Sequence, residues 1–221
     1  MLDELLERAR ADENVLGVVL HGSRARGELV REGSDWDVIV VVRDARGDYE
    51  AERGDAVEAF EVTSLAELPG WMLPAIAWVT PALDKTGGLA EQLAALTTVN
   101  PATAAEPLDG YVNSYYRSAK NARLGLRLAS LLDAQESVRW WLEFVFAVHG
   151  RLRPYNKWLA WELREHPLPV DVDLARLERI ARSGELAEQQ ALFRETETLA
   201  RAHGHGETID GWEPDVAWLR G

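Results

Sequence analysis

Cysteine is absent from this chain of 221 residues, so neither disulfide bonds nor thiolate metal sites can form. The five histidines are scattered, which argues against a structural zinc site. No apolar stretch approaches the roughly 18 residues of a membrane-spanning helix, and residues 1–8 have the pattern of a charged amphipathic helix rather than a signal peptide. Together these absences predict a soluble protein of a reducing, cytoplasmic compartment.

Positive charge is also scarce. The chain has 24 Lys and Arg side chains against 37 Asp and Glu, which gives a formal net charge of −13. Because binding to long nucleic acids depends on clustered basic side chains, this balance argues against such a partner. The deficit is uneven, however, since basic residues outnumber acidic ones between residues 111 and 164. The middle of the chain is therefore locally basic.

Hydrophobic residues make up 47% of the chain, which is enough for a substantial core. The first half alternates patterns typical of strands and of helices. Residues 38–42 are apolar at every position, as in a strand that is buried on both faces. Strands are predicted near 15–20, 36–42, 56–63 and 75–79, and a helix near 89–96. This order predicts an α/β (α+β) domain.

The second half has only helical patterns. One helix is predicted over 111–132, and a second from Asp133, where the spacing to Glu136 is that of a capping box, to a stop at Gly150. Further helices are predicted near 154–165, 172–182 and 185–202. The Ala-, Thr- and Pro-rich segment 101–107 separates the halves. We therefore predict two domains, residues 1–104 and residues 105–221.

Two short motifs accompany the first two strands. Gly22-Ser23 follows the first strand, and Asp35 and Asp37 stand at the start of the second. Alternate residues of a strand project to the same face, so the two carboxylates lie side by side and can chelate magnesium. Free backbone N–H groups where Gly-Ser opens a short helix can hold a phosphate. The alternative is a turn at Ser34-Asp35 that only leads into the strand, with Asp37 exposed.

Gly22-Ser23 followed by Ser34-Asp35-Trp36-Asp37 on a strand resembles the signature of the DNA polymerase β-type nucleotidyltransferase superfamily. The resemblance is to its small bacterial branch, which includes the aminoglycoside adenylyltransferases. It implies a nucleotidyltransferase domain with a mixed central sheet, followed by an all-α helical-bundle domain. It also implies transfer of a nucleoside monophosphate, AMP from ATP, to a hydroxyl of a small molecule such as an aminoglycoside, in a cleft between the two domains.

The resemblance also assigns roles to residues. Asp35 and Asp37 would hold one or two Mg²⁺ ions, and Gly22, Ser23 and Ser34 would contact phosphates or the surroundings of the metal. The segment Glu61-Val62-Thr63 is similar to the strand that supplies the third carboxylate, as metal ligand or general base, in the streptomycin/spectinomycin adenylyltransferases.

A second glutamate competes for the role of third acid. Glu58 precedes Glu61 on the same predicted strand and points to its opposite face, so the choice depends on strand register. The resemblance, and a face shared with Thr63, favour Glu61.

Lysine occurs only three times, at Lys85, Lys120 and Lys157. A flexible ammonium group suits a triphosphate, and Lys120 and Lys157 lie in the locally basic helical half. We therefore expect these two to help bind the nucleotide. A composition that favours Arg and leaves lysines at random positions explains them equally well.

Two other functions fit the same residues. The acceptor could be a macromolecule, a tRNA or a protein side chain, as in toxin-like members of the superfamily, although the overall acidity argues against RNA. The chain could also be a non-catalytic member that binds a nucleotide or a partner protein, although it keeps both aspartates. The sequence leaves the acceptor, the preferred base and the oligomeric state open.

Overall fold

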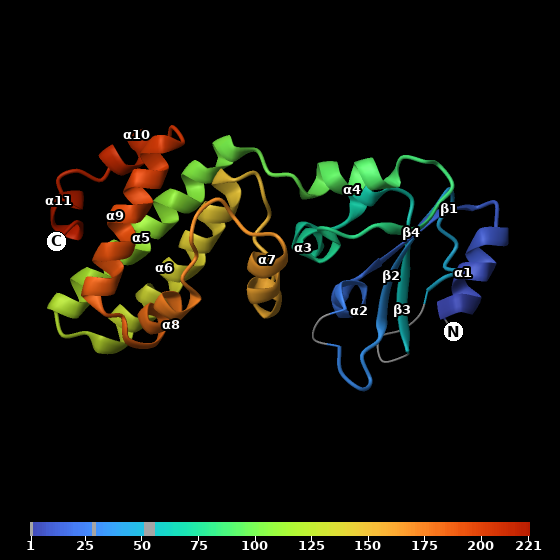
Figure 1. Ribbon diagram of the computed structural model, residues 1–221, viewed down its shortest axis with the longest axis horizontal. Helices are drawn as coiled ribbons and strands as arrows, with labels where there is room; N and C mark the ends of the chain where they lie inside the picture. Colours follow the sequence, from blue (N-terminus) through green and yellow to red (C-terminus); the bar gives the residue numbers. More distant parts are fainter. Residues whose placement is uncertain (1, 28–29, 51–55) are drawn as a thin grey trace. The chain divides into compact units, whose positions relative to one another are not determined.

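The computed structural model describes residues 2–27, 30–50 and 56–221, and it divides into two compact units (Figure 1). The first unit comprises the chain up to Thr98 together with Pro154–Asn156, and the second comprises Val99–Arg153 and Lys157–Gly221. The short 3-10 helix Pro101–Ala104, which the predicted boundary assigns to the first domain, is part of the second unit.

A four-stranded mixed sheet forms the centre of the first unit, with the order β3-β2-β1-β4. Strand β1 pairs antiparallel with β2 and with β4, whereas β2 and β3 run parallel. The bounds are β1 Val15–His21, β2 Trp36–Val42, β3 Val57–Val62 and β4 Pro81–Asp84. The mixed sheet and its first three strands are confirmed.

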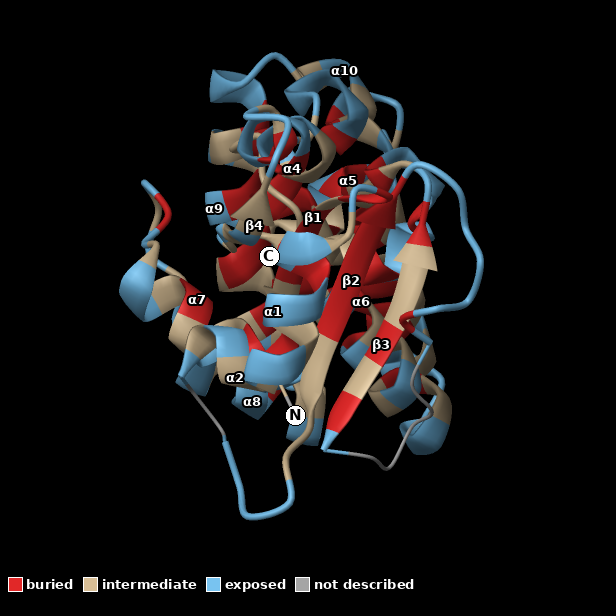
Figure 2. Ribbon diagram, turned by 90° about the vertical axis from the view of Figure 1, so that its right-hand side faces the viewer, coloured by how far each residue is buried: buried red, intermediate tan, exposed pale blue. Residues whose placement is uncertain are grey.

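The central strand β2 is buried on both faces beyond its first two residues (Figure 2). Ile39 and Val41 face one apolar cluster, which also contains residues of the segment 65–93. Val38 and Val40 face another cluster, which includes Ala9 near the N-terminus. This alternation explains why residues 38–42 are all apolar, because each successive side chain enters a different core.

Four α-helices accompany this sheet: α1 Leu2–Ala11, α2 Gly22–Arg26, α3 Leu73–Ile76 and α4 Leu89–Thr97, with 3-10 helices at Leu65–Glu67 and Gly70–Met72. The strand predicted near 75–79 is wrong. That segment contains the end of α3, and the fourth strand begins only at Pro81. Apolar runs of this length do not distinguish a buried helix end from a strand by periodicity alone.

The second unit is a helical bundle, as predicted. Its helices are α5 Ala105–Arg123, α6 Arg127–Val148, α7 Leu159–Glu165, α8 Leu174–Ser183, α9 Leu186–Ala202, α10 Gly206–Asp210 and α11 Val216–Leu219, with 3-10 helices at Pro101–Ala104 and Asn156–Trp158. Helices α5 and α6 run side by side (Figure 1). Buried polar side chains join the bundle, since the Trp141 indole N–H donates to the Thr196 hydroxyl at 2.8 Å.

Two predicted helix bounds are wrong. The helix predicted over 111–132 ends earlier than predicted, and the helix predicted to start at Asp133 begins before that residue. The chain turns at Leu124–Leu126, and Asp133 and Glu136 lie inside α6. Gly125 has a φ of 70° in this turn. The apolar periodicity continues through this turn, so it hides the end of the helix. Gly125 is the sequence signal that marks the turn. None of the helices in the described part of the chain is long and apolar enough to cross a bilayer.

We expect Gly125→Ala to lower the free energy of unfolding by about 1–2 kcal/mol, because an L-residue is disfavoured in the left-handed conformation. No other heavy atom lies within 4 Å of the added Cβ, so backbone strain alone is tested. Urea denaturation followed by tryptophan fluorescence measures the effect. The matched control is Gly211→Ala in the same unit, where φ is −61° and the new Cβ makes only ordinary contacts. Equal stability of the two variants would contradict the prediction.

Candidate functional site

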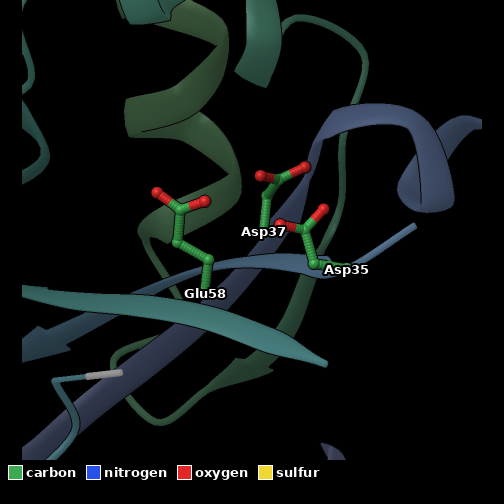
Figure 3. A group of neighbouring side chains, drawn as sticks. All are labelled: Asp35, Asp37 and Glu58. Carbon is green, nitrogen blue, oxygen red and sulfur yellow. The ribbon is translucent and has the colours of Figure 1, made fainter. Parts of the chain in front are cut away.

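Three carboxylates meet at one edge of the sheet. Asp37 is the second residue of β2 and pairs in register with Glu58, the second residue of β3, while Asp35 directly precedes β2. One carboxylate oxygen from each residue lies within 4.8 Å of the other two. Figure 3 shows the three carboxyl groups on the same side of the strands. All three side chains are half-buried, so they remain accessible to a ligand.

The third acid of this cluster is Glu58 rather than Glu61, which the sequence resemblance favours. Glu58 shares a face with Phe60 and Val62, which pack on the same cluster as Ile39 and Val41 of β2. Glu61 pairs with Val40 and lies on the opposite face, with Ala59. Because side chains alternate along a strand, an offset of three residues moves the carboxylate to the other side of the sheet.

Glu61 instead forms hydrogen bonds with residues 46–49, which follow β2. Its carboxylate accepts hydrogen bonds from the backbone N–H groups of Arg46 at 2.7 Å, Gly47 at 3.0 Å and Tyr49 at 2.9 Å. Partial burial raises the pKa of Glu61, but the backbone donors outweigh this effect, so the pKa lies below its ordinary value of 4.5. The residue has a structural role that its position in the sequence does not reveal.

Gly22 packs against the Asp37 carboxyl group. A Cβ added at Gly22 would lie 1.7 Å from Oδ2 of Asp37, and the φ of Gly22 is +74°. Only glycine satisfies both the close approach and this backbone conformation. Gly22 begins α2, as predicted, and Ser23 lies half-buried in the same short helix.

Two arginines of α2 fix the surrounding loops. The Arg24 guanidinium donates to the Ser34 carbonyl at 2.7 Å and lies 5.2 Å from the Trp36 ring centroid. Arg26 donates to the carbonyls of Pro74, Ala75 and Ala77 at 2.9–3.1 Å. The sequence signal for Arg26 is weak, since it consists only of an arginine shortly after the Gly-Ser turn.

The remaining predicted residues have the following places. The Ser34 hydroxyl accepts from the backbone N–H of Arg31 at 2.9 Å, so it closes a turn ahead of Asp35. Lys120 and Lys157 belong to the second unit, where their ammonium groups lie 5.9 Å from the Tyr116 ring centroid and 4.5 Å from that of Trp158. Lys85 donates to the carbonyls of Ala9 and Asp12, so it is structural. The nucleotide-binding roles of Ser34, Lys120 and Lys157 stay predictions.

The donor set of the cluster suits a hard divalent cation. Carboxylate oxygens are the ligands that Mg²⁺ prefers, and such ions accept one or two protein carboxylates together with water and phosphate oxygens. The described residues contain one group of at least three acidic or histidine side chains close enough to share an ion, namely Asp35, Asp37 and Glu58. The geometry therefore fits a site for a divalent cation.

We expect Glu61→Ala to lower the free energy of unfolding by about 1–3 kcal/mol at pH 7, since three backbone donors lose their acceptor. Because the folded pKa is depressed, the stability that Glu61 contributes is complete above about pH 4.5 and is lost as the pH falls through the folded pKa. The difference in free energy of unfolding between variant and wild type should therefore become smaller below pH 4.5. Urea denaturation at a series of pH values measures it. Replacing the exposed Glu32 by Ala is the control, and a gap that does not depend on pH would refute the assignment.

The chain is similar to known proteins in two respects. Among solved structures, the chain is similar to a nucleotidyltransferase-like protein from Exiguobacterium sibiricum, with 11% identity and a TM-score of 0.47 over 94% of this chain and 76% of the other. No curated protein matches the chain. Residues 2–69, which include all three acids, match the family model described as the nucleotidyltransferase domain. The N-terminal part of this chain is therefore similar to a nucleotidyltransferase domain.

Proposed function

We propose that the protein is a Mg²⁺-dependent nucleotidyltransferase that moves AMP from ATP to a hydroxyl group of a small molecule. The observation that carries this proposal is the cluster of Asp35, Asp37 and Glu58 within a matched nucleotidyltransferase domain. A purely structural role would not require acids from β2, from β3 and from the residue before β2 to converge.

Asp35, Asp37 and Glu58 would hold the divalent cation. When bound, Mg²⁺ stabilises the charge on the attacking and leaving oxygens of an in-line displacement at phosphorus. The protein contributes the geometry, because pairing of β2 with β3 fixes Asp37 and Glu58 side by side. The site lies at the end of β2 where burial decreases, so a ligand can reach it (Figure 2).

Binding of the phosphates is assigned to the turn that Gly22 and Ser23 make after β1. Gly22 brings the backbone against Asp37, so a phosphate that meets the cation also lies next to this turn. The Ser23 hydroxyl is a donor suited to a phosphate oxygen, and Ser34 is proposed to add a further contact. Lys120 and Lys157 are proposed to add positive charge, on the sequence argument alone.

Glu58, rather than Glu61, is proposed to act as the general base. A carboxylate beside the cation site can accept the proton of the acceptor hydroxyl as that oxygen attacks phosphorus. The bond from phosphorus to the new oxygen then forms as the bond to the departing pyrophosphate breaks. The acceptor is proposed to be a small molecule of the aminoglycoside type because of the resemblance between the sequence motifs.

Asp37→Asn should abolish Mg²⁺-dependent release of pyrophosphate, because the amide removes one negative ligand from the cation site. The assay is pyrophosphate release from ATP with a panel of hydroxyl-bearing acceptors. Circular dichroism and the midpoint of thermal unfolding should stay close to wild type. An active Asp37→Asn enzyme would remove the metal role assigned to this residue.

The pair Glu58→Gln and Glu61→Gln separates the two glutamates. We expect Glu58→Gln to lower kcat by on the order of 10²-fold or more, which is typical for loss of an acid-base group. Glu61→Gln should keep kcat within a few-fold of wild type and lose stability, since its carboxylate faces the other side of the sheet. The reverse pattern would contradict the assignment of Glu58.

A further inference from the structure

A buried histidine lies directly opposite Asp37. His21 is the last residue of β1 and pairs with Asp37 of β2 in the antiparallel register. Its side chain shares a face with Val19, which packs in the cluster of Ile39 and Val41. The residue is only 7% exposed. Among the described residues, neither of its ring nitrogens has a hydrogen-bond partner.

This burial is costly unless a partner exists in some functional state. Leaving a buried polar group without a hydrogen bond costs about 1–3 kcal/mol. Apolar residues occupy the neighbouring positions on the same face, and a Phe or Leu would avoid the cost. An imidazole carries at least one N–H donor in either protonation state, so its natural partner is an acceptor. Directly opposed residues of an antiparallel pair lie about 4.5–5.5 Å apart at Cα, which places the Asp37 carboxylate within reach of the ring.

We propose that His21 is a positioning residue, whose ring N–H donates to the Asp37 carboxylate when Asp37 binds a divalent cation. This inference depends on the proposed metal role of Asp37. His21 is not itself a ligand, because its nitrogens lie outside the group formed by Asp35, Asp37 and Glu58. Its nitrogens are also buried, which suits contact with a neighbouring side chain rather than with the ion.

The arrangement restrains Asp37 from two sides. Gly22 packs against its Oδ2, and the imidazole N–H of the neighbouring strand would donate a hydrogen bond to the carboxylate. A carboxylate that uses one oxygen for the cation and the other for an N–H donor has little freedom to rotate. Removing such a supporting partner typically weakens metal binding by 10–100-fold.

The test compares His21→Phe with His21→Gln in the full chain. Phenylalanine keeps the bulk and removes the donor, whereas glutamine keeps an N–H donor. Binding of Mn²⁺ alone is measured by electron paramagnetic resonance of the free ion, and folding by thermal unfolding. We expect His21→Phe to weaken Mn²⁺ binding at least tenfold without loss of thermal stability, and His21→Gln to restore most of the affinity. His149→Phe in the second unit is the control, since His149 also has a buried ring nitrogen without a partner.

A measurement on the wild type does not depend on how the variants fold. The ¹⁵N signals of the His21 ring should move when Mg²⁺ is added, because a new hydrogen bond forms at one nitrogen. Unmoved signals, or His21→Phe binding Mn²⁺ as tightly as wild type, would overturn the proposal and leave the imidazole a packing residue. If the wild type binds no Mn²⁺, the proposed metal site fails first. If wild type and His21→Phe bind Mn²⁺ equally tightly, only the proposed role of His21 is wrong.

Discussion

Repulsion between three carboxylates is the constraint around which the first unit is organised. Asp35, Asp37 and Glu58 hold oxygens within 4.8 Å of one another, and two like charges about 4 Å apart repel by about 4 kcal/mol at the effective dielectric constant near a protein surface. The sheet opposes this repulsion because β2 and β3 are paired and β2 is buried on both faces over most of its length. The backbones of Asp37 and Glu58 cannot separate without breaking that pairing. A divalent cation would relieve this repulsion, which is why the arrangement suits the proposed cation site.

The two glutamates of β3 show how one strand serves two purposes. Glu58 extends the acidic edge, and Glu61, on the opposite face, accepts three backbone N–H groups of the connection that precedes β3. Both depend on the same register with β2, in which Asp37 meets Glu58 and Val40 meets Glu61. A slip of one residue would exchange the faces and remove both functions. The apolar residues of β3 prevent this slip because they must remain in their own cores.

Close packing behind Asp37 joins the turn at Gly22-Ser23 to the cluster of Asp35, Asp37 and Glu58. Gly22 permits contact between backbone and carboxylate, and His21 occupies the position directly across from Asp37. Arg26 in turn ties α2 to the carbonyls near α3. The proposed nucleotide turn, the proposed metal ligand and the covering helix therefore form one connected set of contacts. A side chain at Gly22 would displace the Asp37 oxygens, which connects the fold to the proposed chemistry.

The sequence by itself determined the buried strands, the mixed sheet through its family resemblance, the helical second half and the pair Asp35 and Asp37, because these depend on local periodicity and short motifs. It did not determine the third acid. Both Glu58 and Glu61 suit a strand of Val, Ala and Phe, and only the parallel alignment of the first residues of β2 and β3 selects Glu58. The partners of Arg26 were likewise decided by tertiary contacts. Register and packing join residues far apart in the chain, and local patterns carry no information about those distances.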